Sequence, residues 1–201
     1  RDFSPKSALD FGCGVGRIVL PLASMVERVV GIDISESMLD EAQKNCAAHG
    51  LRNTVFRKSD DTLSALDESF DFIHSYIVFQ HIPVVRGRQI FAGLIDRLAD
   101  GGIAAIHLTY AKSAYEKTLG VKRPQAWRAL TRRRTFSYRE RSRNLEMQMN
   151  SYNLNELLFI MQGKGIRHFH VEFCDHDGQL GVILYFRKTP AAQRIPGDYC
   201  P

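Results

Sequence analysis

Short apolar segments alternate with stretches of helical periodicity along the first half of the sequence, and this alternation constrains the fold most. Strands are expected over residues 7–12, 27–33, 53–58, 70–76 and 102–109, and helices over 15–25, 35–49 and 85–99. Such an alternation is typical of a parallel sheet covered by helices on both faces. We therefore predict an α/β fold with a doubly wound sheet.

Patterning near the end of the chain completes this sheet. Asn153 followed by Glu156 predicts the start of a helix that runs to about Met161. Two alternating segments, 166–174 and 179–187, are joined by the turn residues DHDG and predict an antiparallel hairpin. The expected sheet thus has seven strands, of which the last is antiparallel.

A basic segment interrupts the pattern between these two parts. Residues 111–150 contain 11 Lys or Arg against 3 Asp or Glu, whereas the whole chain has a net charge of only +5. Its cations are interleaved with aromatic side chains, which suits a nucleic-acid surface or a cover over an anionic acceptor. A solvated element without a partner explains the same composition. We predict a core of residues 1–110 and 151–187, a basic insert at 111–150 and a tail at 188–201.

Composition narrows the class of protein. A chain of 201 residues with 44% hydrophobic and 24% charged residues is typical of one soluble domain. It has no apolar run of the roughly 20 residues that a membrane helix needs and no secretion signal, so we expect a cytoplasmic protein. Its four cysteines lack CxxC spacing, which favours free thiols. Because the chain begins with Arg1, we expect the natural protein to extend upstream.

The stretch LDFGCGVGR carries the first functional signal. A strand that ends near Asp10 continues through Gly12, Gly14 and Gly16 into a predicted helix. Bare backbone and a helix N-terminus favour an anionic or carboxylate-bearing ligand. The dinucleotide fingerprint GxGxxG needs Gly or Ala at the position of Arg17, so a nicotinamide cofactor fits poorly. Asp33, at the tip of the second strand, could accept two hydrogen bonds from a ribose diol.

Five motifs in this order resemble those of the class I S-adenosylmethionine-dependent methyltransferases. The resemblance implies a Rossmann-like sheet with a reversed last strand, S-adenosylmethionine as the methyl donor and S-adenosylhomocysteine as the product. It also implies that the insert covers the substrate. The motifs are LDFGCGVGR, VVGIDIS, SDD at 59–61, FDFIHSYIVFQHI at 70–82 and LADGGIAAIHL at 98–108.

The resemblance assigns one set of cofactor contacts to the first two motifs. It implies that Gly12, Gly14 and Gly16 pass under the methionine part of the cofactor. Asp10 is then expected near the ammonium group, and Asp33 at the ribose hydroxyls. Capping of the following helix is an alternative role for Asp33.

A second set of contacts concerns the adenine and the acceptor side. The resemblance implies that Ile34 and Met38 lie against adenine and that Asp60, or otherwise Asp61, faces the adenine amino group. The segment from Ser75 to residue 79 is expected to line the far wall of the cofactor site and to begin the acceptor pocket. Alternatively, Met38 belongs to the core, and the two aspartates form a solvated turn.

His81 is the candidate catalytic side chain. Methyl transfer is an in-line displacement that depends mainly on positioning, and a base is needed only when an acceptor proton must leave. Small-molecule members of the resembled family often carry a histidine at this place. A structural histidine just before Pro83 is the alternative.

Histidine, glutamate and cysteine alternate along the penultimate strand and superficially resemble a metal site. In the expected fold this strand lies at the edge of the sheet, where one polar face toward water is ordinary. We therefore predict no metal site. The residues are His168, His170, Glu172, Cys174 and His176.

The sequence favours a small-molecule acceptor over a nucleic acid. The segment SYIVFQHIP lacks the NPPY-like pattern of amino-directed nucleic-acid methyltransferases, and no Pro-Cys nucleophile pair is present. Two alternatives stay open: an RNA methyltransferase that uses the basic insert, and a non-catalytic regulator or partner subunit that binds S-adenosylmethionine. The candidate acceptor contacts are Tyr110, Tyr115, Trp127 and Arg128.

Overall fold

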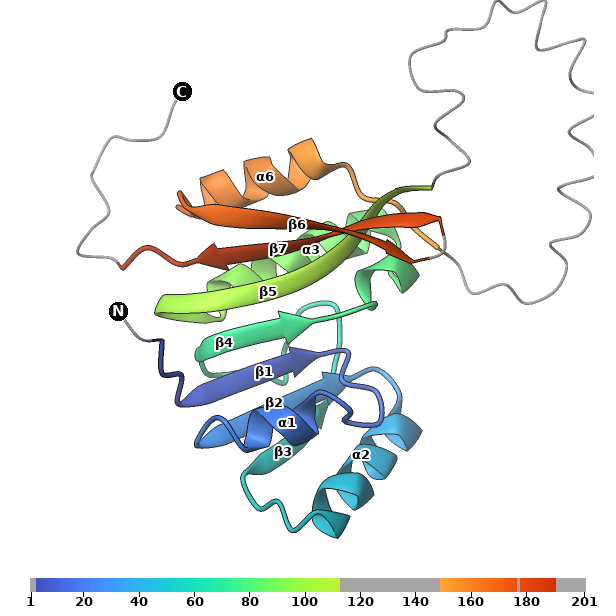
Figure 1. Ribbon diagram of the computed structural model, residues 1–201, viewed down its shortest axis with the longest axis vertical. Helices are drawn as coiled ribbons and strands as arrows, with labels where there is room; N and C mark the ends of the chain where they lie inside the picture. Colours follow the sequence, from blue (N-terminus) through green and yellow to red (C-terminus); the bar gives the residue numbers. More distant parts are fainter. Residues whose placement is uncertain (1–2, 113–148, 177, 191–201) are drawn as a thin grey trace, which may run out of the picture.

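A seven-stranded sheet in the order β3-β2-β1-β4-β5-β7-β6 forms the centre of this computed structural model, which describes residues 3–112, 149–176 and 178–190 (Figure 1). Neighbouring strands pair in parallel, except that β7 pairs antiparallel with both β5 and β6. The predicted sheet of seven strands with a reversed last strand is confirmed. The strands are β1 Ser7–Phe11, β2 Arg28–Asp33, β3 Thr54–Lys58, β4 Phe70–Ser75, β5 Leu98–Lys112, β6 Phe169–His176 and β7 Gln179–Arg187.

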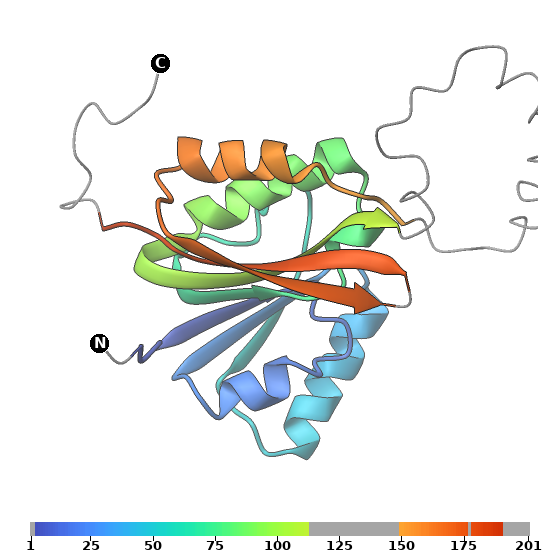
Figure 2. The same cartoon turned by 45° about the horizontal axis from the view of Figure 1, so that its top comes forward.

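Helices cover both faces of the sheet (Figures 1 and 2). Ala8 and Val29 pack with α1 and α2, whereas the next residues along their strands, Leu9 and Val30, pack in the cluster that contains α3 and α6. Because successive side chains of a strand point to opposite faces, the two helix pairs lie on opposite sides. The helices are α1 Val19–Ala23, α2 Glu36–Ala48, the 3₁₀ turn η1 Phe79–His81, α3 Val84–Asp96 and α6 Leu154–Gly163.

The first helix differs from the sequence prediction. It begins at Val19 rather than at residue 15, and it spans only 5 residues. Gly14 and Gly16 have φ of 51° and 82°, a left-handed conformation that a right-handed helix excludes. The predicted helix N-terminus inside the glycine loop is therefore wrong, and no ligand argument rests on its dipole.

The remaining elements follow the sequence closely, with β5 the main exception. Instead of spanning 102–109, β5 runs from Leu98 to Lys112, and its last residue pairs with Gln179 of β7. Nearly all of the predicted basic insert, residues 113–148, and most of the predicted tail, residues 191–201, lie outside the described residues. Among the described helices, none has both the length and the apolar character that crossing a bilayer requires.

Candidate functional site

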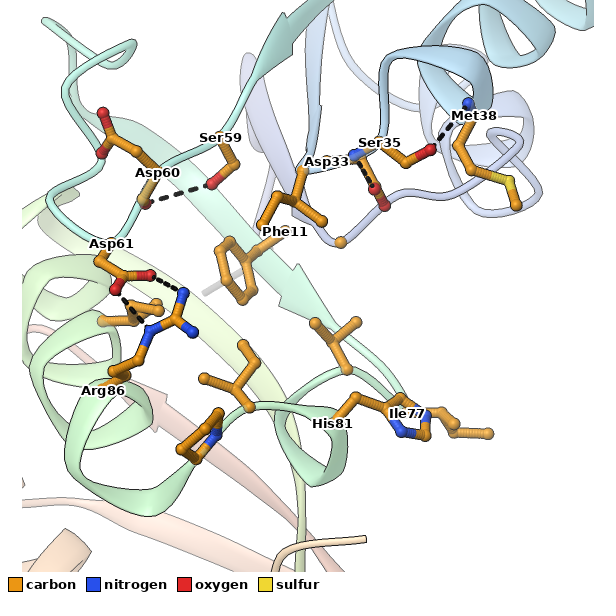
Figure 3. Close-up of a pocket in the computed structure, with 16 residues that line it drawn as sticks. Phe11, Asp33, Ser35, Met38, Ser59, Asp60, Asp61, Ile77, His81 and Arg86 are labelled. Atoms are coloured by element: carbon orange, nitrogen blue, oxygen red, sulfur yellow. Dashed lines mark hydrogen bonds and ion pairs between the residues drawn. The ribbon is translucent and has the colours of Figure 1, made fainter. Parts of the chain in front are cut away.

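A cavity of about 510 Å³ opens at the carboxyl ends of the central strands (Figure 3). It lies where the strand order reverses between β1 and β4, the usual place for a ligand in an open parallel sheet. Its volume is in the range of pockets for drug-sized ligands. The lining comes from the loops after four strands: Phe11, Gly12, Asp33, Ile34, Ser35, Met38, Ser59, Asp60, Asp61, Ile77, Val78, His81, Ile82, Pro83, Arg86 and Ile90.

Asp33 fastens the loop after β1 to the loop after β2. Its Oδ2 accepts a hydrogen bond from the Gly14 N–H at 2.9 Å, and its Oδ1 accepts one from the Ser35 N–H at 2.9 Å. Helix α2 is capped by Ser35, whose side chain accepts from the Met38 N–H. Asp33 is therefore not the helix cap, and each carboxylate oxygen keeps capacity for a further hydrogen bond.

Gly12 and Gly14 of the glycine loop have different surroundings. At Gly12, with φ of 73°, a Cβ would lie 2.3 Å from Cγ2 of Val78, so the loop after β4 can approach closely. Around Gly14, by contrast, a Cβ would meet no atom within 4 Å. The loop thus packs tightly against the cavity wall at one glycine and leaves open space at the next.

Two adjacent aspartates line the cavity with different partners. The Asp60 carboxylate accepts from the backbone and hydroxyl groups of Thr62 and Ser64, and these hydrogen bonds hold its pKa well below the usual range. Asp61 forms a two-pronged ion pair with Arg86, at 2.5 and 2.6 Å, which also lowers its pKa. Figure 3 shows this pair at one side of the cavity. Asp60 therefore fastens its own turn, while Asp61 and Arg86 join the loop after β3 to α3.

Large apolar side chains are exposed at the other side of the cavity. Ile34, in the loop after β2, is 69% exposed, and Met38, in α2, is 44% exposed; both line the cavity. Met38 is thus not a core residue of α2, whose buried residues are Leu39, Ala42 and Cys46. Exposed apolar groups that converge on one cavity are suited to a flat apolar ligand.

His81 belongs to η1 and lines the cavity, and a hydrogen bond fixes the orientation of its imidazole ring. Thr109 donates its hydroxyl to Oε1 of Gln80 at 3.1 Å, which turns the Gln80 amide nitrogen toward Nε2 of His81 at 3.2 Å. Nε2 then accepts this hydrogen bond, so the proton of the neutral ring lies on Nδ1. Gln80 is buried, and its role is not visible in the sequence pattern.

Tyr152 fixes the turn that carries His81. Its hydroxyl lies 3.0 Å from the Phe79 carbonyl and 2.8 Å from the Ile82 carbonyl, at the two ends of η1. A Cβ at Gly87 would lie 1.9 Å from this hydroxyl, so α3 has room for Tyr152 only because residue 87 is glycine. The roles of Tyr152, Gln80 and Arg86 could not be predicted from the sequence, because they depend on contacts between elements far apart in the chain.

Four predicted cofactor residues do not line the cavity: Asp10, Gly14, Gly16 and Ser75. Oδ1 of buried Asp10 is paired with Nδ1 of His74 at 2.8 Å. Gly16 packs against α2, since a Cβ there would lie 3.2 Å from the Cβ of Ala42. The hydroxyl of Ser75 is buried and, within the described residues, has no hydrogen-bond partner. The structure therefore brings the predicted ribose and adenine residues together with His81 and Gly12, whereas the other predicted methionine contacts, Asp10, Gly14 and Gly16, lie outside the cavity lining.

A profile of the family described as "Methyltransferase domain" matches residues 8–102. The chain is similar in fold to the crystal structure of magnesium protoporphyrin IX methyltransferase from Synechocystis PCC 6803 with bound S-adenosylhomocysteine. The TM-score is 0.65 at 21% identity, covering 90% of this chain and 74% of the other.

Curated relatives match shorter parts. The ubiquinone biosynthesis O-methyltransferase of Rickettsia felis is 28% identical over 116 residues, which is 57% of this chain and 46% of that protein. A 23S rRNA (uracil(1939)-C(5))-methyltransferase of Alkalilimnicola ehrlichii is 38% identical over 63 residues, 31% of this chain and 14% of that protein. The chain thus spans less than half the length of each of these relatives.

Proposed function

We propose that this chain is a class I S-adenosylmethionine-dependent methyltransferase and that it transfers a methyl group from S-adenosylmethionine to an oxygen, nitrogen or carbon atom of a small-molecule acceptor. The observation that carries this proposal is Asp33. Its carboxylate joins the two loops at the switch point and keeps acceptor capacity on both oxygens, as a ribose diol requires.

The residues present fit the cofactor. The exposed side chains of Ile34 and Met38 suit the adenine ring, and the 59–61 turn lies on the other side of the cavity. Oδ1 of Asp60 accepts three hydrogen bonds from its own turn, whereas Oδ2 accepts only from the Ser64 hydroxyl, so Asp60, or otherwise Asp61, remains our proposed partner for the adenine amino group. The buried Asp10 carboxylate remains our proposed contact for the ammonium group of the methionine part. Ser75, whose buried hydroxyl has no hydrogen-bond partner among the described residues, remains our proposed residue of the far wall of the cofactor site.

The chemistry requires positioning more than acid or base groups. When bound, S-adenosylmethionine supplies a methyl group on a positively charged sulfur. The protein's task is to hold the acceptor in line behind that methyl group and to exclude water. Asp33 and the glycine loop fix one side of the site, and η1 forms the wall toward the acceptor.

His81 is our proposed base for an acceptor that must lose an O–H or N–H proton. Tyr152 holds the turn that carries His81, and Nε2 must give up the hydrogen bond from Gln80 before it can accept the acceptor's proton. If such an acceptor is used, His81→Ala should lower turnover by about 10²–10⁴-fold while leaving the binding of S-adenosylhomocysteine within a few-fold. Unchanged turnover in His81→Ala would assign the histidine a structural role.

The ends of the basic segment support its proposed role as a substrate cover. The Asn150 N–H donates to the carbonyl of Gln80 at 2.7 Å, and the Tyr152 N–H donates to the carbonyl of Thr109 at 2.8 Å. Asn150, at the end of the basic segment, therefore lies beside η1, next to His81. Of the candidate acceptor contacts, Tyr110 is described, whereas Tyr115, Trp127 and Arg128 lie outside the described residues.

Calorimetric titration with S-adenosylhomocysteine tests the proposal. Saturable binding is expected, with Asp33→Ala weakening it by more than about tenfold, or 1.4 kcal/mol. Asp33→Asn keeps the shape of the side chain but not its charge, so its affinity should lie between those of the wild type and Asp33→Ala. Asp40→Ala removes an exposed aspartate of α2 outside the cavity lining and should leave the affinity unchanged. NAD should not bind. Absence of binding to the folded wild-type chain would contradict the proposal.

An RNA acceptor is the second candidate, favoured by the partial rRNA methyltransferase match and the basic composition of 111–150. It predicts RNA binding that falls steeply with salt. Undetectable binding to mixed RNA at low salt would remove this candidate. A non-catalytic regulator would instead bind S-adenosylmethionine without turnover on any acceptor pool.

A further inference from the structure

A second group of chemically active side chains lies toward the β6 edge of the sheet, beside the loop after β4. His107 of β5 and Cys174 and His176 of β6 each offer a ligand atom, and these atoms lie within 4.8 Å of one another. They come from strands separated by β7, because β5 and β6 both pair with it (Figure 1). None of the three lines the cavity described above.

Gly181 of β7 makes this convergence possible. It pairs with Cys174, and a Cβ built on it would lie 2.5 Å from Nε2 of His107 and 2.9 Å from Sγ of Cys174. Any larger residue at position 181 would occupy the space between the imidazole and the thiol. Gly181 of β7 therefore leaves a space in which the ligand side chains of β5 and β6 come together.

His107 provides an independent sign that a partner belongs here. The residue is fully buried, and its Nε2 has no hydrogen-bond partner among the described residues. A buried polar nitrogen without a partner is costly, so native structures rarely retain one unless water, an ion or a ligand satisfies it. This nitrogen lies beside Cys174, where the other two side chains converge.

We propose that His107, Cys174 and His176 bind one divalent transition-metal ion, with Zn²⁺ the best match. Imidazole and thiolate are the preferred ligands of zinc, and a hard ion such as Mg²⁺ would require oxygen ligands. Zinc bond lengths place tetrahedral ligand atoms roughly 3.5 Å apart. The half-exposed Cys174 and His176 side chains need only a small movement to reach that spacing. Three protein ligands leave one position for water or a small ligand.

Coordination has a defined proton balance. Cysteine binds a metal ion as the thiolate, so the Cys174 thiol has to lose its proton when the ion binds. Metal binding as the thiolate releases this proton. The Ile77 N–H lies 3.3 Å from Nδ1 of His107, which places the proton of the neutral metal-free ring on Nε2. Binding moves that proton to Nδ1 and gives up this long contact, so one proton is released per ion.

Spectroscopic titration of the chelator-treated full chain with Co²⁺, followed by displacement with Zn²⁺, tests the site. We expect one ion per chain, visible bands typical of tetrahedral cobalt and a sulfur-to-cobalt charge-transfer band. Cys174→Ser should abolish that band, and both Cys174→Ser and His176→Ala should weaken binding beyond the about 10–100-fold typical of lost outer-shell partners. Gly181→Ala should weaken binding through the clash with Nε2.

Matched controls separate this site from adventitious binding. Cys46→Ser replaces a buried cysteine of α2, and His170→Ala replaces an exposed histidine of β6 four residues before Cys174. Both variants should bind Co²⁺ like the wild type. No saturable binding, or a charge-transfer band that persists in Cys174→Ser, would overturn the proposal. The titration needs neither S-adenosylmethionine nor turnover, so its outcome is independent of the methyltransferase proposal.

Discussion

At the scale of single residues, Ile77 combines backbone strain with a place in the cavity wall. Its φ is +61°, a conformation that β-branched residues rarely adopt and that costs of order 1–3 kcal/mol. The Ile77 N–H is held by His107, and the side chain lines the cavity. The strained residue thus lies in the part of the loop after β4 that forms the cavity wall.

Replacement by glycine should relieve this strain. We expect Ile77→Gly to raise the free energy of unfolding by about 1 kcal/mol, because glycine adopts positive φ without penalty. Ile18→Gly is the control, since Ile18 is equally exposed, 37% against 38%, but has an ordinary φ of −91°. That variant should lose about 0.5–1 kcal/mol. Urea denaturation measures both, and equal destabilisation by the two substitutions would show that Ile77 is not strained.

At the scale of elements, the contact between α3 and the segment after the insert holds η1 in place. Tyr152 is almost completely buried, and its hydroxyl bridges the carbonyls at both ends of η1. Gly87 of α3 provides the space for this side chain. The position of His81 therefore depends on a residue some seventy positions further along the chain.

Two glycines of α3 provide a matched test of this contact. Gly87→Ala should destabilise the protein by about 1–3 kcal/mol, because the new methyl group overlaps the Tyr152 side chain. Gly93→Ala should be neutral or stabilising by up to about 1 kcal/mol, since its Cβ meets only a flexible end of Leu63 at 3.2 Å. Thermal unfolding distinguishes them. A similar effect of both substitutions would argue against close packing at Gly87, and Tyr152→Phe should reduce the cost of Gly87→Ala.

At the scale of the whole molecule, the cavity joins the loops after four strands, so a bound ligand should stabilise the entire fold. S-adenosylhomocysteine at 100 times its dissociation constant should add about 2.7 kcal/mol to the free energy of unfolding. For a chain of this size, that corresponds to a rise in Tm of roughly 5–10 °C. The same concentration of S-adenosylhomocysteine should raise the Tm of Asp33→Ala much less. A ligand-independent Tm in the wild type would contradict binding at this site.

The sequence predicted the architecture well because strand and helix periodicity are local properties. It placed β2, α2 and β7 within a few residues and correctly put the polar face of β6 at the sheet edge. It failed at α1, where two left-handed glycines postpone the helix. It considered the cysteine and histidines of β6 without His107, because that residue enters through a strand pairing far away in the chain.

The residues of the site were likewise predictable only where their signals are local in the sequence. Asp33 was identified because it ends a strand at a typical distance from a glycine loop, and both signals are local. The partners that fix Asp61, His81 and η1 could not be predicted, because Arg86, Gln80 and Tyr152 have ordinary sequence surroundings. Their roles arise only when the folded elements meet.

The position of β7 has a consequence for how this protein is made. The last strand of the described sheet lies between β5 and β6, so the outer part of the sheet cannot close until residue 187 has left the ribosome. Until then, β5 presents an unpaired edge along its whole length, and such edges recruit other chains. Pairing of β7 with β5 and β6 therefore removes the exposed edge of β5 only at the last step of chain synthesis within the described sheet.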